Sequence, residues 1–157
     1  MSAERNDPSP LVITREYKAP RTLVFEAWSK AEHLEKWFAP DGFTVTCKLD
    51  FRAGGAMELT MEGYGMKNTV HGVYRQIVPN ERIEWVFTFD DIPGHEIPTT
   101  ITFEDAGPGR TRLSVKQVFP QYAALTPAQQ DLLRPRVAGS SIGWGQTLDH
   151  LGQFVEK

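Results

Sequence analysis

A two-residue alternation of apolar and polar side chains runs through the middle of the chain and constrains its fold most strongly. Between residues 43 and 51, aromatic or aliphatic side chains and Cys47 occupy every second position, with Thr, Lys and Asp between them. Successive side chains of a β-strand point to opposite faces, so such a segment has one face for a core and one for water. The same pattern recurs in residues 11–18, 57–62, 70–77, 83–89, 97–103 and 113–117. It predicts an antiparallel sheet of about seven strands.

The alternation slips once, which predicts an irregularity inside one strand. Tyr74 keeps the phase of its segment, but the next apolar residue, Ile77, is one position out of phase. An extra residue in one strand of an antiparallel pair resets the phase in this way. We therefore expect a β-bulge at Arg75 or Gln76.

The last third of the chain changes to a helical period. One apolar stripe recurs at gaps of four and three residues, formed by Val137, Ser141, Trp144, Leu148, Leu151 and Val155. Such a stripe is typical of a long helix with one buried face. Upstream, Thr126 and Gln129 have capping-box spacing around Pro127 and predict a short helical piece. Pro135 is expected to interrupt that piece.

Four glycines in the long helix are unusual, because each costs about 1 kcal/mol relative to alanine in a helix interior. They are Gly139, Gly143, Gly145 and Gly152. Either the sheet or a ligand approaches the helix closely at these positions, or the helix is loose at its start. Both interpretations remain open at this stage.

Two shorter helices are expected after the first strand. Pro20 suits the first turn of a helix over residues 21–28. Ser29 and Glu32 have the spacing of a capping box for a second helix, which Pro40 ends. The order of strand, two short helices, six strands and one long helix predicts an α+β helix-grip fold, in which a curved antiparallel sheet surrounds the C-terminal helix.

Charge and composition narrow the class of protein. The net charge is −3, and acidic and basic residues are interleaved without a Lys/Arg stripe, which argues against a nucleic-acid partner. The single cysteine, Cys47, rules out an internal disulfide and fits a reducing compartment. Residues 1–10 lack the basic and apolar regions of a secretory signal, and no apolar run approaches the roughly 20 residues that cross a bilayer. We expect a cytoplasmic protein with no membrane span, in which residues 1–10 form a flexible tail and residues 11–157 a single helix-grip domain.

Several short motifs give the chain a resemblance to a known family. Near the N-terminus these are Arg15–Pro20, Val24-Phe25, Ala27-Trp28, Leu34, Trp37 and Pro40. Further along they are Asp50–Gly55, Gly72–Tyr74, Ile77, Pro79, Glu81, Arg82, Thr102–Asp105, Gly143-Trp144, Leu148 and Leu151. In these residues the chain resembles activator-of-heat-shock-protein-ATPase-like proteins, within the superfamily of START-related (SRPBCC) domains. The resemblance extends over residues 11–156.

This resemblance implies the helix-grip fold and a pocket between sheet and helix, the default binding site in a fold of this shape. It also implies a role in the stress response, a chaperone as a partner, and a homodimer. Because the superfamily places many activities on one scaffold, the fold alone assigns none of them.

The inward phase of the strands and the apolar stripe of the helix predict what lines the pocket. The expected lining is Trp28, Trp37, Cys47, Met57, Leu59, Met61, Tyr74, Trp85, Phe87, Thr99, Ile101, Gln117, Ser141, Trp144 and Leu148. Most of these side chains are apolar, which suits a hydrophobic small molecule. The polar side chains among them either pair with the backbone and with one another or orient a ligand.

Few residues are placed to perform catalysis or bind a metal. The four histidines, His71 and His150 among them, are scattered without ligand spacing, so we expect neither a metal nor a cofactor. Cys47 is expected to be a small buried hydrophobe without a base to activate it. Most carboxylates fall on the outward phase, while Asp90 and Asp91 lie in a loop that borders the pocket.

We therefore expect a non-enzymatic domain that binds a small apolar or amphipathic molecule, with no catalytic residue. Two alternatives remain open. A cyclase- or hydrolase-like enzyme requires an ionisable side chain inside the pocket. A chaperone-associated interaction module requires an exposed apolar patch of roughly several hundred Å².

Overall fold

The computed structural model describes residues 7–156 and contains one sheet of seven antiparallel strands, in the order β1-β7-β6-β5-β4-β3-β2. The strands are β1 (Leu11–Tyr17), β2 (Thr44–Leu49), β3 (Ala56–Gly63), β4 (Met66–Val78), β5 (Arg82–Phe89), β6 (Ile97–Asp105) and β7 (Thr111–Gln117). The helices are α1 (Arg21–Glu26), α2 (Ala31–Trp37), a 3₁₀ helix (Tyr122–Ala124) and α3 (Pro127–Val155). The predicted α+β helix-grip fold is confirmed.

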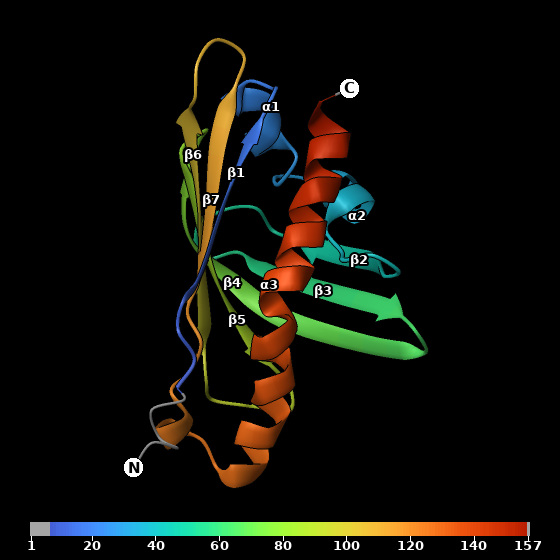
Figure 1. Ribbon diagram of the computed structural model, residues 1–157, viewed down its shortest axis with the longest axis vertical. Helices are drawn as coiled ribbons and strands as arrows, with labels where there is room; N and C mark the ends of the chain where they lie inside the picture. The colour runs from blue at the N-terminus through green and yellow to red at the C-terminus, as the bar shows by residue number, and fades with distance from the viewer. Residues whose placement is uncertain (1–6, 157) are drawn as a thin grey trace.

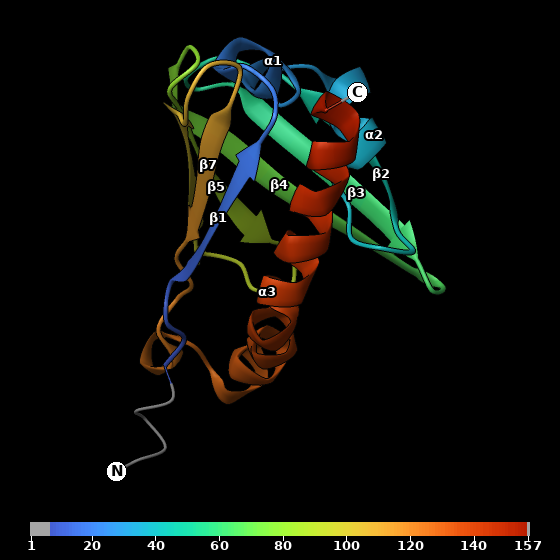
Figure 2. The ribbon, with the colours of Figure 1, turned by 45° about the horizontal axis from the view of Figure 1, so that its top comes forward.

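The sheet curls around α3 instead of lying flat behind it. Figure 1 shows β1, β6 and β7 on one side of α3 and β2, β3 and β4 reaching past its other side. In Figure 2, the molecule is turned and α3 lies across the concave face of the sheet. An apolar stripe on α3 therefore meets inward side chains from both halves of the sheet.

The predicted bulge in β4 is confirmed. Tyr74 pairs with Trp85 of β5, but the next pair joins Gln76 to Glu84, so Arg75 is the extra residue. The bulge resets the phase, because Tyr74 and Ile77 would otherwise point to opposite faces.

α3 is one continuous helix of 29 residues, so the predicted interruption at Pro135 is wrong. A proline inside a helix removes one backbone hydrogen bond and costs about 3 kcal/mol. Here its ring is exposed, while Leu133 beside it is completely buried. Burial of the helix on both sides of the proline offsets that cost. The predicted capping box is confirmed, with Thr126 Oγ1 accepting from Gln129 N at 3.2 Å.

The capping box predicted at Ser29 is wrong. α2 begins at Ala31 with Lys30 as its N-cap, and no side chain caps it. Ser29 instead donates its hydroxyl to the carbonyl of Glu26 at 2.9 Å, at the end of α1. Because α1 and α2 are so close together, Ser29 can form a hydrogen bond with either helix, and it bonds to α1.

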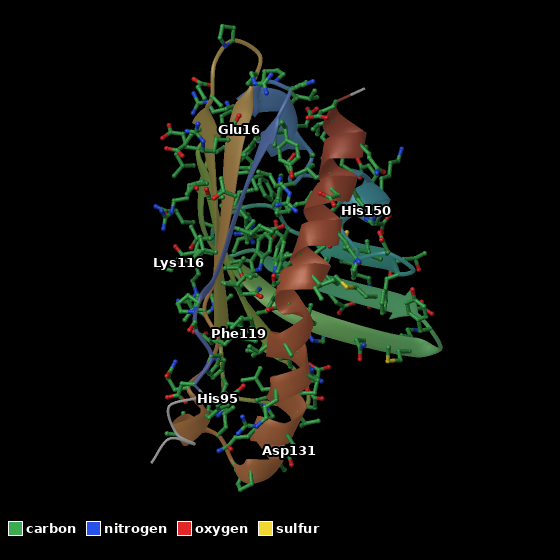
Figure 3. The ribbon with its side chains drawn as sticks, in the orientation of Figure 1. Glu16, His95, Lys116, Phe119, Asp131 and His150 are labelled. Atoms are coloured by element: carbon green, nitrogen blue, oxygen red, sulfur yellow. The ribbon has the colours of Figure 1, made fainter. Side chains whose placement is uncertain are left out.

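Aromatic side chains fill the interior between α1, α2 and the sheet. Trp28 contacts Trp37 edge-on, with ring centroids 4.7 Å apart, and lies 5.9 Å from Trp85. Phe38 joins this cluster to α3, because its ring meets Trp144 at 5.5 Å. Figure 3 shows side chains filling the space between sheet and α3, whereas Lys116 points from β7 to the opposite side. Side chains thus fill the interior at the end of the molecule where α1 and α2 lie.

The predicted N-terminal tail lies partly outside the described residues, which begin at residue 7. Within its described part, Asp7 accepts a hydrogen bond of 3.0 Å from the backbone N–H of Tyr122, and Pro8 is buried. None of the helices described is long and apolar enough to cross a membrane.

Candidate ligand-binding cavity

A cavity of about 230 Å³ lies between α3 and the inner face of β3, β4 and β5. Its lining consists of Phe38, Pro40, Leu59, Met61, Asn68, Val70, Phe87, Phe89, Gln117, Ser140, Gly143, Trp144 and Thr147. All of these side chains are uncharged, and most are apolar. The cavity lies beside the aromatic cluster, with Phe38 and Trp144 separating the two.

The sheet contributes a row of side chains held in register. Leu59 of β3 pairs with Val70 of β4, which in turn pairs with Phe89 of β5. Side chains at paired positions share a face, so these three form one wall of the cavity. Beside them, Gly72 leaves room for Phe87, because a Cβ at Gly72 would come within 2.8 Å of the Phe87 ring.

The helix contributes four residues spaced three and four apart, Ser140, Gly143, Trp144 and Thr147. This spacing places them on one face of α3. A Cβ added at Gly143 would have no atom within 4 Å, so this glycine faces open space at the cavity. The close approach that the glycines suggested occurs elsewhere, at Gly152, where a Cβ would lie 3.2 Å from the ring of Tyr17.

A buried chain of hydrogen bonds crosses the interior beside the cavity. The indole N–H of Trp144 donates to Oε1 of Gln117 at 3.2 Å, and Nε2 of Gln117 donates to Oγ1 of Thr99 at 2.9 Å. Thr99 is completely buried and Gln117 is 8% exposed. Of the inward polar side chains, Thr99 and Gln117 therefore pair with each other, and Gln117 also lines the cavity.

A charged pair borders the cavity on its outer side. Arg136 of α3 donates two hydrogen bonds to the carboxylate of Asp91, at 2.8 and 2.6 Å, and its guanidinium lies 4.4 Å above the ring of Phe89. These hydrogen bonds hold the pKa of Asp91 below its usual value. The pair ties the loop after β5 to α3 without entering the cavity.

A second hollow, of about 500 Å³, lies between α2, β2 and the C-terminal end of α3. It is larger, but charged side chains such as Glu35 and Lys36 share its lining with apolar ones. His150 lies there between two acceptors, the carbonyl of Ala39 and the carboxylate of Asp41, each at 2.7 Å. Within residues 7–156, no three His, Cys, Asp or Glu side chains converge as a metal site.

Comparison with known proteins places the chain in a family. The family model for Activator of Hsp90 ATPase homolog 1-like protein matches residues 18–156. The chain belongs to this family. None of the curated proteins matches this chain.

Solved structures share the fold of this chain over nearly its whole length. It is 31% identical to protein CV1439 from Chromobacterium violaceum, with a TM-score of 0.75, covering 94% of this chain and 97% of that one. It is 25% identical to protein NE0264 from Nitrosomonas europaea, with a TM-score of 0.74 and 92% of each chain covered. A protein from Staphylococcus epidermidis is 26% identical, with a TM-score of 0.70, covering 94% of this chain and 90% of that one.

Five of the predicted pocket residues line the cavity: Leu59, Met61, Phe87, Gln117 and Trp144. Most of the others are buried but do not line this cavity, namely Trp28, Trp37, Met57, Tyr74, Trp85, Thr99, Ile101 and Leu148. Side chains with the predicted inward phase therefore divide between a filled end and a hollow end of the same interior.

Two predicted residues lie apart from both groups. Ser141 is exposed, and Ser140 takes the expected place at the cavity. A helix has 3.6 residues per turn, so steps of three and four back from Trp144 are equally compatible with one stripe. Cys47 is half-buried against α2, where its thiol donates to the carbonyl of Ala31 at 3.5 Å. Burial, reinforced by two nearby glutamates, raises the pKa of this thiol to about 12.

Eight lining residues were absent from the prediction: Phe38, Pro40, Asn68, Val70, Phe89, Ser140, Gly143 and Thr147. Val70 and Phe89 continue the inward phase of Leu59 and Phe87, so the alternation could have identified them. Phe38 and Pro40 follow α2 in an irregular segment, where no periodicity indicates the direction of a side chain.

Proposed function

We propose that this protein is a binding domain for a small apolar molecule held in the cavity between α3 and strands β3 to β5. The observation that carries this proposal is the cavity itself, about 230 Å³ in volume and lined by uncharged, mostly apolar side chains. Ligand pockets typically combine an apolar lining with a few polar groups that orient the ligand. Membership of the Activator of Hsp90 ATPase homolog 1-like family and the helix-grip fold support a ligand-binding or interaction domain.

The character of the lining favours binding over catalysis. A cyclase or hydrolase needs an acid or base within hydrogen-bond reach of its substrate, and the residues that line this cavity include no ionisable side chain. Cysteine is intrinsically the most reactive nucleophile among the side chains of this chain. Cys47 nevertheless lies outside the cavity, and its pKa is raised.

The test uses two glycines of α3 as a matched pair. Gly143 lines the cavity, whereas Gly139, one turn earlier, is exposed, and neither would place a Cβ near another atom. Gly143→Leu places a side chain at the cavity, whereas Gly139→Leu places the same side chain in solvent at a position that does not line the cavity.

We expect neutral ring compounds such as naphthalene, indane and 1-indanone to bind the wild type and Gly139→Leu, measured by ligand-observed NMR and thermal shift. Binding should be lost in Gly143→Leu. Failure of every compound to bind the wild type, or binding that survives Gly143→Leu, would contradict the proposal.

A second candidate is a protein-interaction module, which could engage a chaperone or a second copy of the chain as a homodimer. Large apolar side chains are exposed at the β3–β4 hairpin and on α3, with Tyr64 at 74%, Met66 at 52% and Ile142 at 67%. The family description, which names an activator of the Hsp90 ATPase, also favours it. An interaction module of this kind would stimulate a chaperone ATPase in the cytoplasm under stress. Ile142→Ser should weaken this stimulation, while binding of small molecules in the cavity persists.

A further inference from the structure

We infer that the ligand of this cavity is a neutral ring compound bearing one hydrogen-bond acceptor, such as a ketone or lactone carbonyl, which accepts from the side-chain amide of Gln117. This inference rests on the proposed function and specifies its ligand class. It follows from the hydrogen-bond inventory of Gln117, the charge of the lining and the cavity volume.

The neighbours of Gln117 determine which way its amide faces. An indole N–H donates but never accepts, so the amide atom facing Trp144 at 3.2 Å must be the oxygen. The NH₂ group consequently faces Thr99, whose hydroxyl oxygen lies 2.9 Å away. The amide is held in one orientation because the opposite one would place two donors against each other.

This orientation leaves one donor of Gln117 for a ligand. The amide nitrogen carries two hydrogens, and Thr99 is its hydrogen-bond partner among the described residues. Gln117 is 8% exposed and lines the cavity. A buried donor without a partner costs about 1–3 kcal/mol, so a ligand that brings an acceptor relieves this cost.

The other polar side chains that line the cavity are weaker candidates than Gln117 for donating a hydrogen bond to the ligand. The hydroxyl of Ser140 already donates to the carbonyl of Val137 at 2.7 Å. Asn68 is exposed, so water satisfies it at the edge of the cavity. Thr147 is buried and lines the cavity, which makes it the rival anchor that an experiment has to separate from Gln117.

Charge and size limit the rest of the ligand. A charged group moved from water into an apolar site needs a partner of opposite charge, and the lining supplies none. An apolar cavity of about 150 Å³ holds one benzene ring. The present cavity, of about 230 Å³, therefore has room for a fused or substituted ring and a polar group.

The test compares three probes of similar shape, which are 1-indanone, indane and indane-1-carboxylate. We expect 1-indanone to bind the wild type roughly two- to tenfold more tightly than indane, the net value of one hydrogen bond after the ketone has lost its hydration. The carboxylate should not bind. In Gln117→Met the preference for the ketone should disappear, whereas the matched variant Thr147→Val should keep it.

Two further measurements distinguish loss of the Gln117 donor from misfolding of the variant. Gln117→Met leaves the indole N–H of Trp144 without an acceptor, so Gln117→Met combined with Trp144→Phe removes both groups together. In the wild type itself, the infrared C=O stretch of bound 1-indanone should lie at lower wavenumber than in hexane, as for a hydrogen-bonded ketone.

The outcomes separate this inference from the proposed function. If the probes bind and Gly143→Leu abolishes their binding, but indane binds as tightly as the ketone, the cavity binds ligands and the acceptor inference is wrong. Loss of the ketone preference in Thr147→Val alone would assign the anchor to Thr147 and overturn it as well. If no probe binds, the proposed function itself fails.

Discussion

The hydroxyl of Tyr17 donates a hydrogen bond of 2.8 Å to the backbone carbonyl of Leu148, which joins β1 at one edge of the sheet to α3. The ring of Tyr17 also lies against Gly152, one turn further along the helix. Tyr17 is 3% exposed, so both contacts are sheltered from water. One tyrosine of the edge strand thus determines how closely the C-terminal half of α3 approaches the sheet.

Gly152→Ala should therefore destabilise the protein although alanine favours helix. The new Cβ would come 3.2 Å from the Tyr17 ring, which cannot retreat without breaking its hydrogen bond to Leu148. Overpacking typically costs about 1–3 kcal/mol, against a gain in helix propensity of about 1 kcal/mol. We expect urea denaturation to show a lower free energy of unfolding than in the wild type.

Gly139→Ala is the matched control, because its Cβ would meet no atom within 4 Å. It should raise the free energy of unfolding by about 0.5–1 kcal/mol. Equal stability of the two alanine variants would show that Tyr17 does not restrict the helix.

Two buried tryptophans should respond differently to the same substitution. The indole N–H of Trp37 donates to the carbonyl of Ala27 at 3.0 Å, whereas that of Trp28 has no partner among the described residues. Phenylalanine removes a satisfied hydrogen bond in Trp37→Phe but an unpaired buried donor in Trp28→Phe. We expect Trp28→Phe to be the less destabilising by about 1–2 kcal/mol in chemical denaturation. A larger loss for Trp28→Phe would contradict the unpaired state of its N–H.

The thiol of Cys47 should react slowly at neutral pH. Burial first, and then the negative charges of Glu35 and Glu32, raise its pKa to about 12. Against an unperturbed cysteine, with a pKa of about 8.5, the thiolate fraction at pH 8 falls roughly a thousandfold. Iodoacetamide alkylation should therefore be slow in the folded protein, accelerate towards pH 12, and become fast in urea. A folded-state rate within tenfold of the urea-unfolded rate is the result that would refute this.

The contribution of Asp91 to stability should fade in acid. Hydrogen bonds from Arg136 lower the pKa of its carboxyl, so the folded protein holds the charged form more strongly than the unfolded chain does. The contribution is complete above the usual Asp pKa of about 3.9 and is lost as the pH falls through the lowered value. The stability advantage of the wild type over Asp91→Asn should thus shrink below about pH 4. An advantage that stays constant from pH 7 to pH 3 would exclude this mechanism.

The alternation of apolar residues predicted the strands well because each strand has one buried face whose period depends only on backbone geometry. Even the bulge between Tyr74 and Gln76 left a visible change of phase. The prediction of a break in α3 at Pro135 was wrong. The local preference of proline favours a break, but the packing of the helix on both sides of Pro135 overrides this preference.

The candidate site was less predictable than the fold for the same reason. Periodicity reports whether a side chain points inward, as it does for both Trp85 and Phe87, but not whether its neighbours leave space. Trp28, Trp37 and Trp85 pack against one another and fill one end of the interior. The cavity occurs where Gly143 and the smaller side chains of β3 and β4 meet α3.

From the sequence alone, the family, the order of elements and the inward face of each strand could be derived, since these depend on local patterns. Only the tertiary structure decided that Ser140 and not Ser141 faces the cavity, and that Gln117 is held between Thr99 and Trp144. Those features depend on distances between β6, β7 and α3, which are set by packing across the whole interior and leave no trace in residue spacing.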